Sequence, residues 1–146
     1  MITDYFRLEG KKALITGAGK GIGARIATVF SEMGADVALL ARTESDLDSV
    51  AREVTELGRE ALTFACDVTD EAAIAGVVEK LTEHWGSLDI LVNNAGAPGQ
   101  GYGSLKKVTK ARFVNTLDIN LTSAYTLTHL ALPLLQAAPS ASIVNV

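Results

Sequence analysis

The sequence has little cysteine, no long apolar run and no N-terminal targeting pattern. Its one cysteine, Cys66, excludes an internal disulfide and indicates a reducing compartment. No apolar stretch reaches the ~18 residues of a membrane span. The N-terminus also lacks the charged and apolar regions of a signal peptide. We therefore expect a cytoplasmic protein without membrane contact.

Positive charge and metal-ligand spacing are also scarce. The net charge is −4, and no basic run offers a surface to nucleic acid. His84 and His129 lie far apart without metal-ligand partners at standard spacing, so no metal site is predicted. Hydrophobic residues make up 48% of the 146 residues, enough for a core. We expect a single domain over residues 1–146.

Short apolar runs alternate with helical patterns along the whole chain. Segments in which apolar residues have helical spacing lie between these runs. Gly34, Gly58 and Gly86 follow these segments, where a helix commonly ends in a residue with a left-handed conformation. The alternation predicts an α/β fold, a doubly wound parallel sheet with right-handed crossovers. The apolar runs are continuous, which is typical of strands covered on both faces. The predicted strands are 13–16, 36–41, 61–66, 89–93 and 142–146.

Single residues predict further boundaries. Thr69 is the expected N-cap of the third helix, because Asp70 and Glu71 follow it as acids of the first turn. A long apolar helix contains residues 113–130, and its broad apolar arc indicates a second helix or a second subunit as partner. Pro133 lacks an N–H group and should kink or end that helix.

The stretch TGAGKGIG, residues 16–23, lies between the first predicted strand and a helix. The first N–H groups of a helix are unpaired, and the aligned peptide dipoles favour an anion there. Glycines allow positive φ and let a diphosphate approach the backbone without meeting a Cβ atom. The stretch therefore predicts a phosphate-binding turn, although such a turn alone can also merely connect a strand to a helix.

The second predicted strand ends in Leu39-Leu40-Ala41-Arg42, without an acid. Dinucleotide folds that prefer NAD usually place Asp or Glu there to bind the ribose 2′-hydroxyl. Asp36 stands at the opposite end of the strand. Arg42 instead offers a planar fork suited to a 2′-phosphate, and Lys20 could supply a second cation to the same phosphate. These residues predict NADP(H) as the cofactor.

Three motifs together resemble the short-chain dehydrogenase/reductase (SDR) family. They are Thr16-Gly17-x-x-x-Gly21-Ile22-Gly23, Cys66-Asp67-Val68 and Asn93-Asn94-Ala95-Gly96, and their order and spacing match from about Leu8 onwards. The resemblance implies a Rossmann fold with strand order three-two-one-four-five-six-seven, of which five strands would be present. It also implies a homo-oligomeric oxidoreductase that moves a hydride between NADP(H) and a carbonyl or secondary alcohol.

The resemblance also assigns roles to single residues. Asn120 matches an asparagine that distorts its helix and helps to hold a proton-relay water, so it is the catalytic candidate; a purely structural amide is the alternative. Asn93 is expected to brace the strands. Residues at the ends of strands one to four would hold the nucleotide. These cofactor-binding candidates are Gly17, Gly19, Lys20, Gly21, Ile22, Gly23, Arg42, Asp67, Val68, Asn94, Ala95 and Gly96.

The family's catalytic Ser, Tyr and Lys follow the fifth strand, within which this sequence ends at Val146. We therefore expect a domain that is incomplete at its C-terminus, truncated before the catalytic helix, and inactive alone. Tyr102 and Lys106 have the Tyr-x-x-x-Lys spacing, but nearby glycines and a proline oppose a helix there. The alternative function is a non-catalytic NADP(H)-binding module or regulatory subunit. The second and third motifs disfavour a methyltransferase.

Overall fold

The protein, described here by a computed structural model covering residues 5–98 and 105–146, contains a five-stranded parallel sheet. The strand order is β3-β2-β1-β4-β5, and every neighbouring pair is parallel. The predicted doubly wound α/β sheet and the strand order are confirmed. The strands are β1 (Lys12–Thr16), β2 (Asp36–Ala41), β3 (Ala61–Ala65), β4 (Ile90–Asn93) and β5 (Ser142–Asn145).

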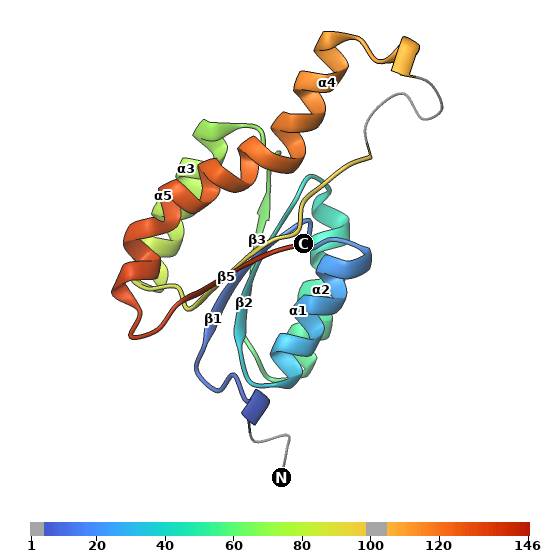
Figure 1. Cartoon of the computed structure of the whole chain (residues 1–146). Helices are drawn as coiled ribbons and strands as arrows, with labels where there is room; N and C mark the ends of the chain where they lie inside the picture. The colour runs from blue at the N-terminus through green and yellow to red at the C-terminus, as the bar shows by residue number, and fades with distance from the viewer. Residues whose placement is uncertain (1–4, 99–104) are drawn as a thin grey trace.

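Helices cover both faces of the sheet. α1 and α2 lie on one face, and α3 and α5 lie on the other (Figure 1). The chain changes face after β3, so β1 and β4 are neighbours whose connections leave in opposite directions, and a crevice forms where they diverge. The helical segments are α1 (Gly21–Glu32), α2 (Glu44–Glu56), α3 (Glu71–His84), the 3₁₀ turn η2 (Leu105–Lys107), α4 (Lys110–Leu117), the π-helix η3 (Asp118–Thr122) and α5 (Ser123–Ala137).

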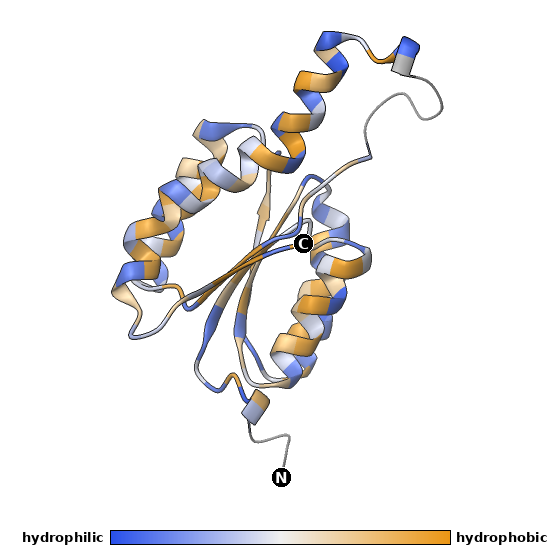
Figure 2. Cartoon of the chain, in the orientation of Figure 1, coloured by the Kyte–Doolittle hydropathy of each residue, from blue (hydrophilic) through white to orange (hydrophobic). Residues whose placement is uncertain are grey.

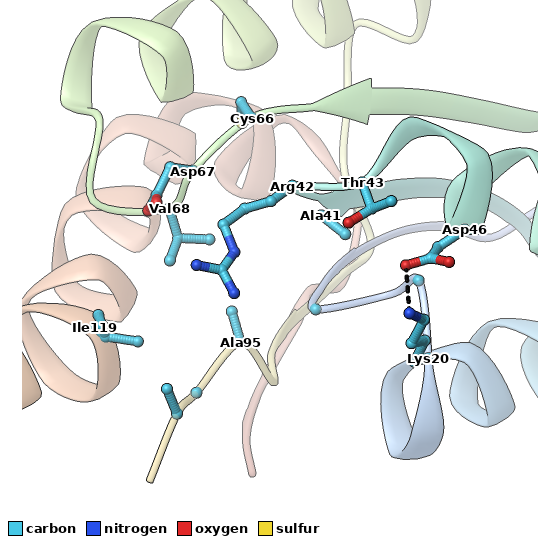
Figure 3. A pocket seen from close by; sticks show the side chains of 14 residues that line it. Lys20, Ala41, Arg42, Thr43, Asp46, Cys66, Asp67, Val68, Ala95 and Ile119 are labelled. Carbon is cyan, nitrogen blue, oxygen red and sulfur yellow. Dashed lines mark ion pairs between the residues drawn. The ribbon is translucent and has the colours of Figure 1, made fainter. Parts of the chain in front are cut away.

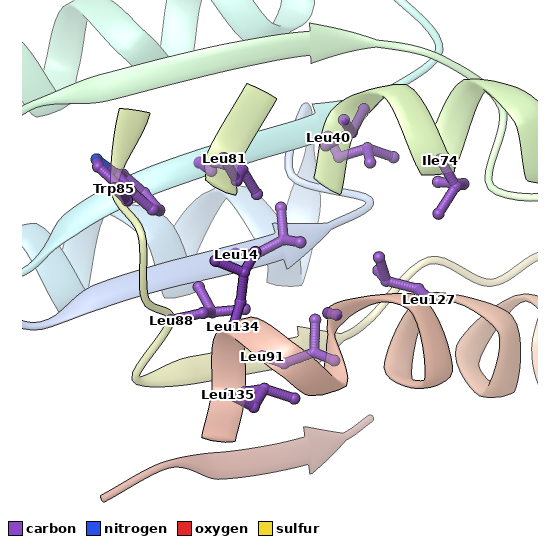
Figure 4. Packing of buried hydrophobic residues seen from close by; sticks show 13 residues of the cluster. Leu14, Leu40, Ile74, Leu81, Trp85, Leu88, Leu91, Leu127, Leu134 and Leu135 are labelled. Atoms are coloured by element: carbon purple, nitrogen blue, oxygen red, sulfur yellow. The ribbon is translucent and has the colours of Figure 1, made fainter. Parts of the chain in front are cut away.

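Successive residues of each central strand enter different cores. On β1, Leu14 joins the core under α3 and α5, whereas Ala13 and Ile15 join the core under α1 and α2. Both faces are therefore dry, and this explains why the central strands read as continuous apolar runs. The core shared with α3 and α5 is drawn in Figure 4; its labelled members are Leu14, Leu40, Ile74, Leu81, Trp85, Leu88, Leu91, Leu127, Leu134 and Leu135.

Two aspartates fasten the amino ends of the strands, opposite the predicted nucleotide site. Asp89 is only 8% exposed, and its carboxylate accepts from the Lys12 N–H group at 3.0 Å and from Lys11 Nζ at 2.8 Å. Asp36 accepts from the Glu60 N–H group at 2.9 Å and pairs with Arg59 at 2.9 Å. Asp36 thus has a structural role at the start of β2, in keeping with its exclusion as a ribose ligand.

One boundary prediction is wrong, and one of the two outcomes predicted at another boundary is excluded. The N-cap of α3 is Asp70, whose carboxylate accepts from the Ala73 N–H group at 3.0 Å. Thr69 instead donates to Asp67 through its N–H group and its hydroxyl, at 2.9 and 2.8 Å. Of the two effects predicted for Pro133, a kink or an end of the helix, the end is excluded, because α5 continues to Ala137.

The predicted long apolar helix is present as α4, η3 and α5 in direct succession. Its N-terminal part, α4, extends past the ends of the strands and carries apolar residues (Figure 2). Phe113, Leu121 and Tyr125 are 57%, 62% and 69% exposed. Among the residues that the structure describes, no helix has the length and hydropathy needed to cross a membrane.

Glu60, just before β3, holds the C-terminal end of α3 against the sheet. One carboxylate oxygen lies 2.7 Å from His84 Nε2, and the other accepts from the Trp85 indole N–H group at 2.8 Å. The Trp85 carbonyl in turn accepts from Lys12 Nζ at 2.9 Å. Hydrogen bonds from Trp85 and then from His84 lower the pKa of the Glu60 carboxyl group. The charged form is therefore the one that the fold favours.

We predict that Glu60→Ala lowers the free energy of unfolding by about 1 kcal/mol at neutral pH, because two hydrogen bonds are lost. A lowered pKa in the folded state gives stability that is present above the unfolded pKa of about 4.3 and lost as the pH falls below it. The difference from the native protein should therefore shrink in acid. Urea unfolding at neutral and acidic pH measures it, with exposed Glu56→Ala on α2 as the control. A difference that grows in acid would contradict this account.

The glycine turn packs too closely for a side chain at Gly23. A Cβ atom there would collide with the Gly17 carbonyl oxygen and lie 2.6 Å from Asn94 Nδ2. We predict that Gly23→Ala destabilises the protein by roughly 1–3 kcal/mol through overpacking. The matched control is Gly76→Ala inside α3, where a Cβ atom meets nothing within 4 Å. That change should stabilise by about 0.5–1 kcal/mol. Equal effects of the two substitutions in urea unfolding would refute the packing argument.

Candidate cofactor site

A cavity of about 340 Å³ opens at the carboxyl end of the sheet, where the turns after β1, β2, β3 and β4 meet (Figure 3). This is the position at which ligands bind in open α/β sheets, beside the strands whose connections diverge. The lining residues are Gly17, Gly19, Lys20, Ala41, Arg42, Thr43, Asp46, Cys66, Asp67, Val68, Ala95, Gly96, Ala97 and Ile119.

The glycine turn forms one wall of this cavity. Gly17 and Gly21 have φ values of 64° and 58°, which only glycine adopts without strain. A Cβ atom at Gly17 would lie 2.9 Å from Asn94 Nδ2 and 3.0 Å from Ala95 Cα. α1 begins directly afterwards with no side-chain cap and no acid in its first turn. The turn thus has the backbone approach and the helix N-terminus that a phosphate group requires.

Thr16 fixes this wall to the end of β4, a role that the sequence did not indicate. Its hydroxyl oxygen accepts from the N–H groups of Asn94 at 3.0 Å and Ala95 at 2.9 Å, and donates to the Val92 carbonyl at 3.4 Å. The Asn94 side chain donates to the carbonyls of Thr16 at 2.9 Å and Gly17 at 3.3 Å. Asn94 therefore joins β4 to the glycine turn.

Arg42 and Asp67 lie on the adjacent wall. The Arg42 side chain extends from the end of β2 across the cavity toward Val68 and Ala95 (Figure 3). The Thr69 N–H group and hydroxyl lower the pKa of Asp67, and the positive charge of Arg42 lowers it further. Asp67 is consequently a carboxylate that can accept from a ligand.

Lys20, the second cation that we expected on the 2′-phosphate, forms an ion pair with an acid of the neighbouring helix. Lys20 Nζ lies 3.0 Å from an Asp46 carboxylate oxygen, away from the Arg42 guanidinium (Figure 3). Asp46 belongs to the first turn of α2 and was not identified from the sequence. An acid in a first helical turn usually serves the helix dipole, and nothing in the sequence pattern shows that it also faces the glycine turn.

Asn120 lies in the π-helix η3 and holds the segment after β4. Its carbonyl oxygen accepts from the Ala97 N–H group at 3.2 Å, and its amide donates to the Ala97 carbonyl at 3.0 Å and the Thr116 carbonyl at 2.8 Å. A Cβ atom at Gly96 would come within 2.8 Å of the Asn120 oxygen. The helix is distorted at this asparagine, as the resemblance implied.

The remaining predicted residues divide into two groups. Asn94 and Asn120 support the walls from behind, and so does the buried Gly23, whereas Gly21 and the 63% exposed Ile22 stand at the start of α1. None of these lines the cavity directly. Two unexpected lining residues, Ala97 and Ile119, each stand next to a predicted position, Gly96 and Asn120, but no pattern in the sequence marks them as lining the cavity.

Residues outside this group have structural roles. Asn93 donates to Asn145 Oδ1 at 2.9 Å and to Thr128 Oγ1 at 3.2 Å, so the predicted brace is confirmed. Burial raises the pKa of the half-buried Cys66 thiol, which therefore stays neutral. His129 stacks on Tyr125. Tyr102 lies outside the described residues.

Across residues 5–98 and 105–146, no three histidine, cysteine or acidic side chains gather where they could hold a metal ion. The charges that line the cavity come from Lys20, Arg42, Asp46 and Asp67, and they suit an organic ligand that carries phosphate and amino groups.

Comparisons with known proteins by sequence and by structure identify the same family. A family model described as short chain dehydrogenase matches residues 11–146. An uncharacterized oxidoreductase of Mycobacterium tuberculosis is 38% identical over 147 residues, which cover 100% of this chain and 55% of that protein. The chain thus spans about half the length of the curated relatives that it matches.

Solved structures superpose closely on the same segment. L-Sorbose reductase from Gluconobacter frateurii, complexed with NADPH and L-sorbose, has a TM-score of 0.87 at 31% identity and matches 94% of this chain and 52% of its own. Carveol dehydrogenase from Mycobacterium avium, in complex with NAD, has a TM-score of 0.87 at 31% identity and matches 94% of this chain and 54% of its own. The motifs, the fold and these matches agree: the chain belongs to the short-chain dehydrogenase family of oxidoreductases.

Proposed function

We propose that this chain is the cofactor-binding part of an oxidoreductase that transfers a hydride between NADP(H) and a carbonyl or secondary-alcohol substrate. Arg42 carries the choice of cofactor. It leaves the end of β2, where an acid would favour NAD, and it enters the same cavity as the glycine turn. Because solved relatives bind either NAD or NADPH, the family alone leaves both cofactors open.

The chemistry of the lining residues supports a specific placement of the dinucleotide. The diphosphate would lie on the N–H groups at the start of α1, along the turn from Gly17 to Gly23. Ionised Asp67 would accept from the adenine amino group, and Val68 would pack on the ring. Ala95 and Gly96, which end the β4 segment, would border the nicotinamide-side ribose.

The bound nicotinamide would supply the hydride, and this chain would position it and the water near the substrate. Asn120 lies in the π-helix η3, and its amide donates to the backbone carbonyls of Thr116 and Ala97. We propose that it holds the proton-relay water expected from the family resemblance. The residues that transfer the proton would come from the part of the complete protein that follows this chain.

Two further proposals concern the oligomeric state of the protein and its location in the cell. The exposed apolar side chains Phe113, Leu121 and Tyr125 support assembly as a homo-oligomer, because such surface is costly to leave in water. The single cysteine supports a cytoplasmic location, where thiols stay reduced. Small-molecule carbonyl or alcohol substrates are the only partners that the proposal requires besides the cofactor.

We predict that Arg42→Ala weakens NADPH binding by about ten- to a hundredfold, because a charge-assisted hydrogen bond to phosphate is worth roughly 1.5–3 kcal/mol. NADH binding should change by less than about threefold, since NADH has no 2′-phosphate. Fluorescence titration of the complete protein with both cofactors measures the two dissociation constants. Exposed Arg52→Ala on α2 is the matched control. Equal losses for NADPH and NADH would refute NADP(H) preference.

We predict that Asn120→Ala lowers kcat by about a hundredfold, because the proposed proton-relay water loses its position. The dissociation constant for NADPH should change by less than about threefold, since Asn120 does not line the cavity. The assay follows NADPH oxidation with the ketone or aldehyde that the complete protein reduces fastest. Asn115→Ala in neighbouring α4 is the control. Unchanged kcat in Asn120→Ala would assign Asn120 a structural role only.

A further inference from the structure

The Lys20–Asp46 ion pair lies beside the glycine turn in the proposed cofactor site. The family resemblance assigns no role to Asp46. The nitrogen and oxygen atoms are 3.0 Å apart, and both residues line the cavity. Asp46 is placed against the glycine turn by Gly19. A Cβ atom on Gly19 would lie 3.0 Å from Asp46 Cβ and 3.4 Å from Ala41 Cβ. The absence of a side chain at Gly19 thus allows α2 to bring its acid beside Lys20.

The two members of the pair differ in their freedom. The Asp46 side chain is only 23% exposed and belongs to the first turn of α2, where the helix dipole favours a negative charge. The Lys20 side chain is 78% exposed, so its ammonium group can move at little cost. Asp46 is therefore the fixed partner, and Lys20 is the mobile one.

Lys20 consequently has two possible anions. Asp46 holds it when no phosphate is near, and a 2′-phosphate would have to draw it away or share it. NADH carries no such phosphate and leaves the pair intact. Arg42 lines the same cavity, and its side chain extends toward Val68 and Ala95 rather than toward Asp46 (Figure 3). Lys20 is therefore the predicted phosphate ligand whose ammonium group forms an ion pair with a carboxylate of the cavity wall.

We propose that Asp46 is a specificity-determining residue that limits the preference for NADP(H) by holding Lys20. This inference rests on the proposed function, since it needs the 2′-phosphate to bind at this end of the cavity. It makes the protein less selective than Lys20 and Arg42 alone would make it, and it leaves NADH as a usable second cofactor.

The test compares the dissociation constants of NADPH and NADH in the complete protein and its Asp46→Asn variant, by fluorescence titration at low salt. Asp46→Asn keeps the shape of the side chain but releases Lys20. NADPH binding should tighten by roughly two- to fivefold, the range of an exposed ion pair, and NADH binding should stay the same. Asp48→Asn, an exposed change of equal charge on α2, is the control and should leave both constants unchanged.

A second comparison asks whether Asp46 acts through Lys20. In a Lys20→Met background, Asp46→Asn should give a clearly smaller gain for NADPH, because no ammonium group remains to be released. An equal gain in that background would overturn the proposal, and so would equal effects of Asp46→Asn and Asp48→Asn. Weaker NADH binding in Asp46→Asn would also overturn it, because Asp46 would then be a ribose ligand. Failure of the native protein to bind either cofactor would instead refute the proposed function.

Discussion

The site depends on one set of hydrogen bonds between neighbouring strands. β1 and β4 end side by side, and their continuations must diverge because they lead to opposite faces of the sheet. The Thr16 hydroxyl and the Asn94 amide satisfy the backbone groups that this divergence exposes. A buried polar group without a partner costs roughly 1–3 kcal/mol. These bonds therefore hold the crevice open at the point where a ligand can enter.

The cavity wall carries charges of both signs, which the turns after the strands place around the cavity. The N-terminus of α1 and Arg42 attract anions, whereas the carboxylate of Asp67 attracts hydrogen-bond donors. The polar groups are fixed from behind: Thr69 orients Asp67, and Asn120 orients Ala97. Asp67 and Ala97 are thus held by partners that do not line the cavity, and this arrangement lowers the entropy cost of binding a ligand there.

Much of this architecture could be predicted from the sequence. The five strands fall within a residue or so of the predicted ranges. The glycines that follow α1, α2 and α3 have the expected positive φ values of 104°, 76° and 69°. These features are local, because burial on both faces dictates a continuous apolar run and a left-handed C′ position selects glycine. The glycine turn and the ends of the strands could also be located from the sequence, because local patterns of residues encode them too.

The differences between prediction and structure arose where a contact outside the predicted pattern decides the outcome. Thr69 and Asp70 are both good capping residues, and only the carboxylate of Asp67 decides between them, because it engages Thr69. The pairing of Lys20 with Asp46 depends on how α2 packs on the glycine turn, and no pattern within either segment encodes it. Pro133 is tolerated in α5, where packing on the sheet outweighs the lost hydrogen bond.

The π-helical turn at Asn120 also decides which way the long helix faces. Each residue of an α-helix advances the chain by about 100° around the axis, and a π turn adds one residue. In an uninterrupted α-helix, Leu117 would lie roughly 80° from Leu127, which is buried against the sheet. The added residue rotates Leu117 to the opposite side, in line with Tyr125. One continuous rod thereby carries two apolar stripes out of phase, one closing the core and the other facing outward.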